Sequence, residues 1–148
     1  MKKVYIIAEV GPNHQGSLNM AIRYVKKISK IGADAIKFQI GLAEEHYSLD
    51  SFKPDYHKKN IKNKLNIIQQ AKKRLLSFEE HLKLYKVCKK HKIDYISSAF
   101  DLKSLKFITN NFKFPYFKIA SGEMISIDTI KYISQKNIPI ILSTGMAK

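Results

Sequence analysis

The stretch GADAIKFQI, residues 32–40, decides the fold of this 148-residue chain. From Ala35 onward its apolar residues are almost continuous, which is typical of a strand that is covered on both faces. The residues before it carry apolar side chains at helical spacing, with Ser17 as a candidate cap and Gly32 as a candidate end. The stretch therefore predicts a helix between Ser17 and Gly32 that is followed by a buried strand.

Four further runs of the same character lie along the chain. They are VYIIAEV (4–10), DYISSAF (94–100), YFKIAS (116–121) and IPIILST (138–144). Helix-like or loop segments separate the five runs, and this alternation predicts an α/β fold with a parallel sheet and right-handed crossovers. The last three runs begin 22 residues apart, which is close to one unit of a (βα) barrel.

A further helix is expected after Ser77, because Ser77-Phe-Glu-Glu80 has the sequence of a capping box. The side chains predicted to face inward from this helix are Phe78, Leu82, Tyr85 and Cys88. Asp101 and Ser126 are candidate caps for the helices after the third and fourth strands in chain order.

A polar stretch rich in Lys and Asn separates the second strand from the third. We expect an extended loop over 41–63 and a helix over 65–76. The length of the chain and its 45% apolar residues suit a single core, so 1–148 is treated as one domain or as part of one.

The formal net charge is +15, with 27 Lys and Arg against 12 Asp and Glu. Only Arg23 and Arg74 are arginines, whereas nucleic-acid surfaces favour the bidentate fork of arginine. No helix-turn-helix, RRM, KH or zinc signature is present either. We therefore expect solvated lysine-rich faces that attract small anions, and no nucleic-acid partner.

No apolar run reaches the roughly 18–20 residues that cross a bilayer. The short apolar start of the chain is interrupted by Glu9, which a signal peptide would not allow. Cys88 is the single cysteine, which excludes a disulfide framework. These features predict no membrane partner and a reducing compartment, most simply the cytoplasm.

Polar side chains gather where the five runs end. They are Glu9, Lys37, Gln39, Ser98, Lys118, Ser121 and Ser143. Because the carboxyl ends of parallel strands share one edge of a sheet, we expect these side chains to lie together. An ammonium inside a strand is costly unless an anion meets it, so Lys37 and Lys118 predict a site for a phosphorylated or carboxylated ligand.

Two other interpretations of these lysines stay open. Lys37 can pair with Glu9 or Glu123 as a buried ion pair without a ligand. A lysine in a strand can also form a Schiff base, as in some aldolases.

The five histidines show no metal-ligand spacing such as HxH or HExxH, so no metal site is expected from this chain. His14 lies in the first loop and is interpreted as a polar turn residue. Cys88 is interpreted as core packing.

Four strings at these positions resemble the sialic acid synthase family, whose members make N-acetylneuraminate and related nonulosonates. They are IIAEVGPNHQGS (6–17), GADAIKFQ (32–39), FKIASGEM (117–124) and PIILSTGMA (139–147). The strings SFEE (77–80) and YISSAFD (95–101) match more loosely, and together the matches cover essentially the whole chain.

This resemblance implies a TIM-type (βα) barrel, of which the chain holds about five of the eight parallel strands. It implies a transferase that condenses phosphoenolpyruvate with N-acetylmannosamine or a related N-acetyl hexosamine and releases phosphate. A divalent metal, Mn²⁺ or Mg²⁺, that polarises the sugar aldehyde is implied for the intact enzyme, and so is a homodimer.

The resemblance also implies site residues. The residues that correspond to phosphoenolpyruvate ligands are Lys37, Lys118, Ser121 and Ser143, with Gln39 nearby. Ser98 stands where the family usually has Thr, which keeps the hydroxyl, and Asn60 corresponds to an Asn of the long loop. Glu9 corresponds to the carboxylate that works near the sugar and the tetrahedral intermediate, so Glu9 and Lys37 are the expected catalytic residues.

The metal-binding histidines of the family and its C-terminal antifreeze-like domain match nothing in residues 1–148. The expectation is that the chain encodes the phosphoenolpyruvate half of a site and is inactive, or nearly so, alone. Two alternatives remain: a synthase of the legionaminate or pseudaminate type or one that uses a phosphorylated sugar, and a non-catalytic or truncated module that needs a partner half.

Overall fold

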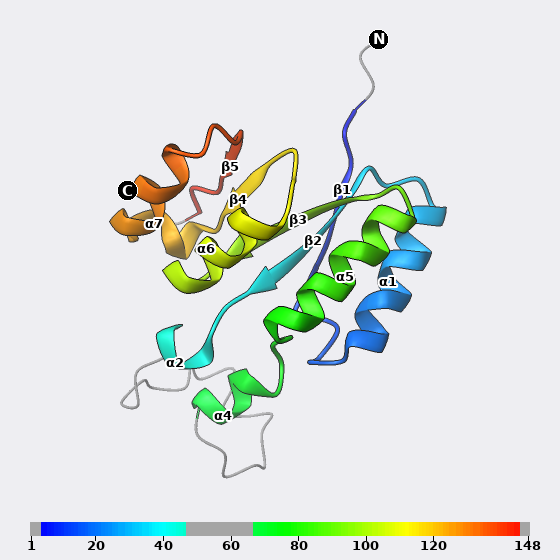
Figure 1. The fold of residues 1–148 in the computed structure, drawn as a ribbon, viewed down its shortest axis with the longest axis horizontal. Helices are drawn as coiled ribbons and strands as arrows, with labels where there is room; N and C mark the ends of the chain where they lie inside the picture. Colours follow the sequence, from blue (N-terminus) through cyan, green and yellow to red (C-terminus); the bar gives the residue numbers. More distant parts are fainter. Residues whose placement is uncertain (1–3, 47–66, 146–148) are drawn as a thin grey trace.

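A computed structural model of the protein describes residues 4–46 and 67–145. The strands are β1 (Ile7–Gly11), β2 (Ala35–Ile40), β3 (Asp94–Ala99), β4 (Phe117–Ile119) and β5 (Ile140–Leu142). The helices are α1 (Leu18–Lys30), α2 (Ala43–His46), α4 (Ile67–Lys72), α5 (Phe78–Lys90), α6 (Leu102–Asn111), the 3-10 helix η1 (Ser121–Ile125) and α7 (Ile127–Ser134). Every strand pairing is parallel, which confirms the predicted α/β class (Figure 1).

The strands form two sheets, and the prediction of one continuous sheet is wrong in this respect. The strand orders are β1-β2-β3 and β4-β5. Strands β3 and β4 are neighbours in space, but among the described residues no ladder of hydrogen bonds joins them. Two features explain the break: β4 has only three residues, and Pro115 just before it has no N–H to donate.

Most predicted helix caps are present. The Ser17 hydroxyl accepts from the Met20 N–H at 3.2 Å, and Ser77 and Glu80 form the reciprocal capping box. The Asp101 carboxylate accepts from the Ser104 N–H at 2.7 Å. Ser126 also precedes a helix, but its hydroxyl bonds the Thr129 hydroxyl instead of a backbone N–H, so its predicted side-chain cap is wrong.

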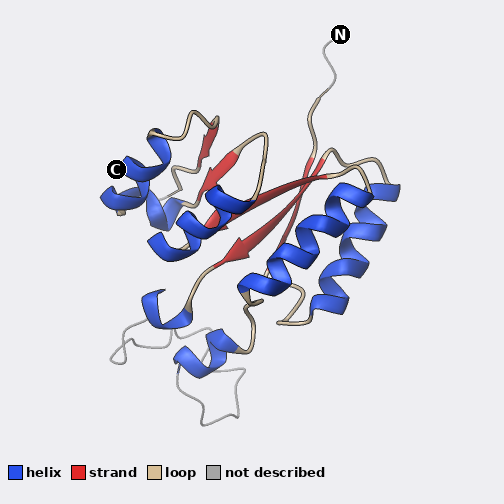
Figure 2. Cartoon of the chain, viewed as in Figure 1, coloured by secondary structure: helices blue, strands red, loops and turns tan. Residues whose placement is uncertain are grey.

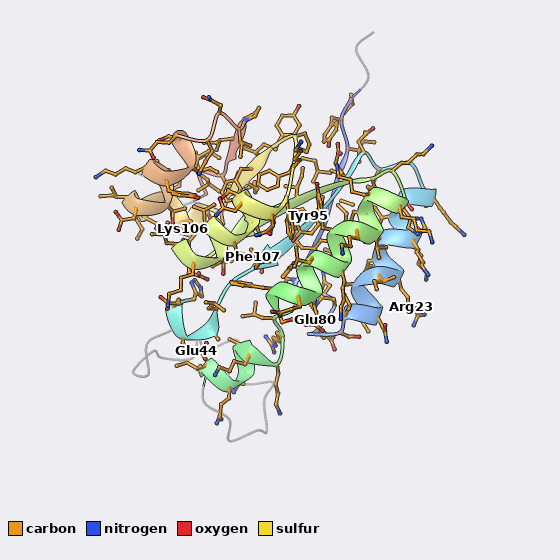
Figure 3. All side chains as sticks on the ribbon, in the orientation of Figure 1. Arg23, Glu44, Glu80, Tyr95, Lys106 and Phe107 are labelled. Atoms are coloured by element: carbon orange, nitrogen blue, oxygen red, sulfur yellow. The ribbon has the colours of Figure 1, made fainter. Side chains whose placement is uncertain are left out.

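The core lies between the sheet β1-β2-β3 and the helices α1 and α5, which run side by side over one face of it (Figures 1 and 2). Strand β2 contributes Ile36, Phe38 and Ile40, which are all fully buried. Tyr95 and Phe107 extend the packed interior toward α6, where Phe107 stacks on Phe78 with ring centroids 4.2 Å apart (Figure 3).

Helix α5 buries a different set of side chains from the predicted one. His81, Leu84 and Cys88 are fully buried, while Phe78, Leu82 and Tyr85 pack at the margin of the core and stay partly exposed. The side of α5 that faces the core is therefore the one that carries His81, Leu84 and Cys88, and not the predicted one. The core position predicted for Cys88 is confirmed, and its thiol is free.

The polar stretch after β2 begins with helix α2. Glu44 forms an ion pair with Lys72 of α4, and Glu45 forms one with Lys103 of α6. The His46 ring packs edge-on against Phe100 with centroids 5.2 Å apart. The described start of the 41–63 stretch is thus attached to its neighbours. The rest of it, together with the start of the helix predicted over 65–76, lies outside the described residues.

In the part of the chain that the structure describes, no helix is both long and apolar enough to cross a membrane.

Candidate functional site

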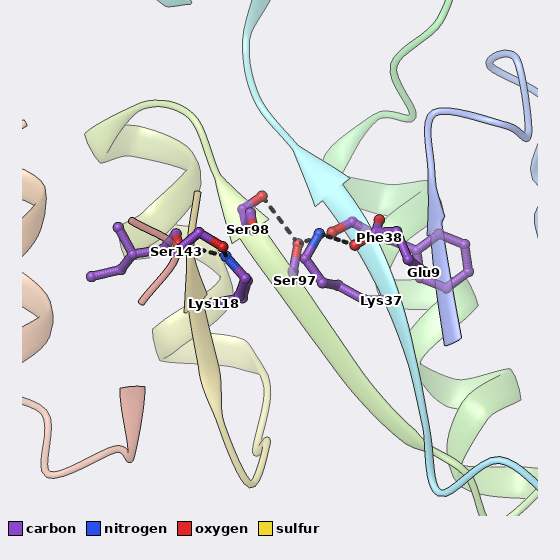
Figure 4. Close-up of polar contacts among 8 residues, drawn as sticks. Glu9, Lys37, Phe38, Ser97, Ser98, Lys118 and Ser143 are labelled. Atoms are coloured by element: carbon purple, nitrogen blue, oxygen red, sulfur yellow. Dashed lines mark hydrogen bonds and ion pairs between the residues drawn. The ribbon is translucent and has the colours of Figure 1, made fainter. Parts of the chain in front are cut away.

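The register of β1, β2 and β3 places four of the predicted site residues on one face. Glu9 is opposite Lys37 in the β1–β2 pair, and Gln39 is opposite Ser98 in the β2–β3 pair. Because side chains alternate along a strand, Lys37 and Gln39 lie on the face opposite Phe38, which faces the core. The strand order and the pleat thus bring these residues to one polar face, on which Figure 4 shows Glu9, Lys37 and Ser98.

Lys37 and Glu9 form an ion pair across the first two strands. Lys37 Nζ lies 2.6 Å from Glu9 Oε2, and the lysine side chain is 10% exposed while the carboxylate side chain is 55% exposed. Of the two carboxylates considered as partners, Glu9 is the one that meets Lys37. The lysine end of the pair is buried and the carboxylate end is exposed. The ion pair is therefore compatible with an anion site beside it.

A second lysine is held by the β4–β5 pair. Lys118 Nζ donates to Ser143 Oγ at 2.5 Å and to the Ile119 carbonyl oxygen at 2.6 Å. The loops that follow the two strands also meet, because a Cβ built on Gly145 would lie 3.7 Å from Ser121 Oγ. Lys118, Ser121 and Ser143 therefore form one cluster at the ends of β4 and β5.

Electrostatics link this cluster to the Glu9–Lys37 pair on the other sheet. Burial lowers the pKa of the Lys118 ammonium, and the positive charge of Lys37 lowers that pKa further, while the negative charge of Glu9 raises it. Glu9 thus pairs directly with Lys37, while Lys118 contacts the Ile119 carbonyl and Ser143 and feels the charges of both Glu9 and Lys37. The uncompensated positive charge suits an anionic ligand.

Ser98 supplies a hydroxyl without a hydrogen-bond partner. The residue is 1% exposed, and its Oγ atom makes no hydrogen bond to the described residues. Its neighbour Ser97 differs, because the Ser97 hydroxyl donates to the Phe38 carbonyl oxygen at 3.4 Å. A buried polar atom without a partner is rare in proteins, and a ligand on this face would supply one.

The structure therefore brings together seven of the eight predicted site residues in two linked groups. The first is Glu9, Lys37, Gln39 and Ser98, and the second is Lys118, Ser121 and Ser143. The eighth, Asn60, lies outside the described residues.

Two buried histidines lie behind this face, and the sequence predicted the burial of neither, although the turn position predicted for His14 is confirmed. His14, predicted as a polar turn residue, is 1% exposed, and its Nδ1 accepts from the Gly16 N–H at 3.1 Å. His81 is fully buried on α5 and lies 2.8 Å from the Tyr95 hydroxyl. The spacing of His81, Leu84 and Cys88 is helical, so the sequence did contain the signal for the buried side of α5.

Two further carboxylates, Glu123 and Asp101, lie near the strand ends. Burial raises the pKa of Glu123, His46 lowers it, and Asp101 raises it, so these three groups share one neighbourhood. Asp101 accepts from the Leu42 N–H at 2.8 Å and from Ser104, which ties the end of β2 to the start of α6. A distance of 59 residues between Asp101 and Leu42 hides this contact from sequence patterns.

Within 4–46 and 67–145, no three His, Cys, Asp or Glu side chains are grouped so that they could hold a metal ion.

Comparison with known proteins gives a consistent result. A sequence model of the NeuB family matches residues 24–148. N,N'-diacetyllegionaminic acid synthase of Campylobacter jejuni subsp. jejuni serotype O:2 is 39% identical over 147 residues, which are 99% of this chain and 44% of that protein. N-acetylneuraminate-9-phosphate synthase of Drosophila melanogaster is 31% identical over 145 residues, which are 97% of this chain and 38% of that protein.

A solved structure is similar over the same extent. The crystal structure of N-acetylneuraminic acid (sialic acid) synthetase from Leptospira borgpetersenii serovar Hardjo-bovis matches with a TM-score of 0.82 and 28% identity. The match covers 99% of this chain and 46% of that one. The chain thus spans less than half the length of the relatives it matches.

Proposed function

Because this chain belongs to the NeuB family, we propose that the protein condenses phosphoenolpyruvate with an N-acetyl hexosamine to give a nonulosonic acid. In this reaction the enol carbon of phosphoenolpyruvate bonds to the aldehyde carbon of the sugar. Water then adds to the oxocarbenium-like carbon. The bond between that carbon and the bridging oxygen breaks, so inorganic phosphate leaves with the bridging oxygen. The acceptor is N-acetylmannosamine or a close relative.

The observation that carries this proposal is the excess of positive charge where the two sheets meet. Lys37 pairs with Glu9, and Lys118, which contacts Ser143 and the Ile119 carbonyl, feels the positive charge of Lys37. Phosphoenolpyruvate carries a phosphate and a carboxylate, so it offers the anions that two ammonium groups require. Lysine also binds phosphate well as a compact point charge.

Neutral groups around the lysines can complete the binding of phosphoenolpyruvate. The donors assigned to it are the hydroxyls of Ser98, Ser121 and Ser143 and the amide of Gln39, and the family resemblance alone adds the amide of Asn60. The unpartnered Ser98 hydroxyl supports this assignment directly. Ser143 already accepts from Lys118, so its own proton remains available for a ligand oxygen.

Glu9 is assigned the electrostatic and proton-transfer role. Its carboxylate is more than half exposed while one oxygen stays on Lys37, so it faces the space in which a ligand would lie. A fixed negative charge there stabilises an oxocarbenium-like carbon, and a carboxylate can accept a proton from the attacking water. Lys37 would hold both Glu9 and the substrate anion in place.

The family resemblance also implies a divalent metal, Mn²⁺ or Mg²⁺, that polarises the sugar aldehyde. The described residues offer no group of three His, Cys, Asp or Glu side chains that fits such a metal. We further propose that the five strands are part of a TIM-type barrel, that the intact protein is a homodimer, and that it works in the cytoplasm. The free thiol of Cys88 supports a reducing compartment.

A second candidate differs only in the acceptor sugar. The relative at 39% identity is named for diacetyllegionaminic acid, which favours a diacetamido hexose as the acceptor. The relative at 31% identity is named for a 9-phosphate product, which favours a phosphorylated sugar. A third candidate, a non-catalytic module that needs a partner half, would retain phosphoenolpyruvate binding and lack turnover.

The experiment is a phosphate-release assay with phosphoenolpyruvate, Mn²⁺ and each acceptor in turn, together with calorimetric titration of phosphoenolpyruvate alone. Phosphate release with one N-acetylated acceptor supports the synthase and names its substrate. With the intact protein, binding without release supports the module, whereas with residues 1–148 alone it agrees with both the synthase and the module. Absence of both refutes the proposed function.

A further inference from the structure

The first strand ends on a glycine in the left-handed region of backbone conformation. Gly11 has a φ of +51°. The β1–β2 register shifts between Glu9, which is opposite Lys37, and Gly11, which is opposite Phe38. A glycine of this conformation at a shift in register is typical of a β-bulge, a feature that changes the direction of a neighbouring side chain. Because the shift in register follows Glu9 directly, it affects the direction in which the Glu9 side chain points from β1.

The space over Gly11 is occupied by two side chains of the candidate site. A Cβ built on Gly11 would lie 3.1 Å from Glu9 Oε1 and 3.5 Å from Gln39 Nε2. The other carboxylate oxygen, Oε2, is the one that lies 2.6 Å from Lys37 Nζ. The bare backbone of Gly11 therefore gives Glu9 room to reach Lys37 with one oxygen while the second oxygen lies over the glycine.

We propose that Gly11 is a positioning residue of this site: its missing side chain keeps the Glu9 carboxylate on Lys37 and leaves room for the Gln39 amide. The proposal rests on the proposed function only for the identity of the ligand, phosphoenolpyruvate. The placement of Glu9 is a property of the protein alone and can be tested without any ligand.

The atoms near Gly11 decide what a methyl group there would do. Both of the nearest groups are side-chain ends and not backbone, so a methyl group would displace the Glu9 carboxylate and the Gln39 amide more readily than the strand. At 3.1 Å the carboxylate must move by a few tenths of an ångström, and because its other oxygen lies 2.6 Å from Lys37 Nζ, such a movement changes the geometry of the ion pair. Small displacements of positioned groups have large effects on ligand binding and rate, with about 1 Å costing about 100-fold.

Gly32 provides a matched control for the backbone. It also has a left-handed φ, +86°, and a Cβ built on it would meet nothing within 4 Å. An alanine at Gly32 therefore carries the same kind of conformational strain as an alanine at Gly11, without the contact to Glu9.

The first test measures thermal unfolding of the full chain. The test variants are Gly11→Ala, Glu9→Ala and the two combined. The control variants are Gly32→Ala alone and Gly32→Ala combined with Glu9→Ala. Backbone strain is expected to lower Tm by about 3–6 °C for either glycine substitution. Gly11→Ala should lower Tm further, and this extra loss should disappear when Glu9 is alanine. An equal loss with and without Glu9, as expected for Gly32→Ala, would overturn the proposal.

The second test is calorimetric titration of the same variants with phosphoenolpyruvate. Gly11→Ala is expected to weaken binding about tenfold or more, whereas Gly32→Ala should bind as the wild type does. Equal binding by the two variants would overturn the positioning role. If the wild type itself binds no phosphoenolpyruvate, the proposed function fails, and the unfolding measurements still decide whether Gly11 positions Glu9.

Discussion

His81 of α5 and Tyr95 of β3 form a buried polar pair, in which the Nδ1 atom of the imidazole lies 2.8 Å from the phenolic oxygen. Both side chains are within 1% of complete burial. The His81 Nε2 atom makes no hydrogen bond to the described residues. The pair therefore holds a neutral imidazole in the layer between the sheet and its helices.

This burial makes stability depend on pH. Burial lowers the pKa of His81 to about 3 and also lowers the pKa of His14. Histidines of the unfolded chain titrate near a pKa of about 6.5, so below that pH the unfolded state binds more protons and gains stability. The free energy of unfolding should be greatest above pH 6.5 and should fall toward pH 3, by up to about 1.4 kcal/mol per pH unit from His81, and His14 adds a loss in the same direction.

Urea unfolding at several values between pH 7.5 and pH 4 measures this dependence. His81→Phe should reduce the slope of stability against pH, even though it destabilises the fold by removing the partner of Tyr95. His91→Gln, at the end of the same helix, is the control and should leave the slope in place. An unchanged slope in His81→Phe would contradict this account.

Lys118→Met tests the second lysine of the site. The substitution removes an ammonium that donates to Ser143 and lies within electrostatic reach of Lys37. A hydrogen bond to a charged group contributes about 1.5–3 kcal/mol, so phosphoenolpyruvate affinity should fall about 10- to 100-fold. Lys131→Met, on the exposed side of α7, is the matched control and should bind normally in the same titration. Equal affinities of the two variants for phosphoenolpyruvate would show that Lys118 does not bind it.

Ser98→Ala should have opposite effects on stability and on binding. The substitution removes a buried hydroxyl that has no hydrogen-bond partner in the part of the chain that the structure describes, so the ligand-free protein should keep its Tm or gain slightly. Phosphoenolpyruvate affinity should fall about two- to tenfold if that hydroxyl bonds the ligand.

Ser97→Ala is the comparison for Ser98→Ala, because its hydroxyl lies on the core side and donates to the Phe38 carbonyl oxygen. It should lower Tm and leave phosphoenolpyruvate affinity unchanged. The reverse pattern, with binding lost in Ser97→Ala alone, would show that the two serines have been assigned to the wrong faces.

Asp101→Ala should destabilise the protein through two connections at once. It removes the acceptor for the Leu42 N–H and for both donors of Ser104, so a helix cap and a tie to the end of β2 are lost together. The expected loss is about 1–3 kcal/mol in urea unfolding. Asp128→Ala, an exposed aspartate in the first turn of α7, should change stability much less. Similar losses would show that the link to Leu42 contributes nothing.

The strands and most helix starts could be predicted because their signals are local. Ser17, Ser77 and Asp101 each lie a fixed number of residues from the backbone group they bond, so the sequence shows them directly. The assembly of Glu9 beside Lys37 followed from the rule that parallel strands end at one edge. Local patterns and one topological rule were enough for these features.

Other features depend on contacts between distant segments. The separation of β4 and β5 from the other strands depends on how β4 is positioned, which no local run of residues reveals. The link between Asp101 and Leu42 joins residues far apart in the chain, and the burial of His14 depends on packing against Phe38. The conformation of Gly11 could be suspected from its residue type, but the approach of Glu9 and Gln39 to it could not.

The interruption between β3 and β4 has a mechanical consequence for ligand binding. Lys37 belongs to one sheet and Lys118 to the other, so no ladder of backbone hydrogen bonds fixes the distance between the two ammonium groups. An anion that both lysines bind would add a polar connection across this junction, beside the packing of β3 and β4 in the shared core. Occupancy of the site would then stiffen the molecule across this junction, and amide hydrogens of β4 and β5 would exchange more slowly with the solvent.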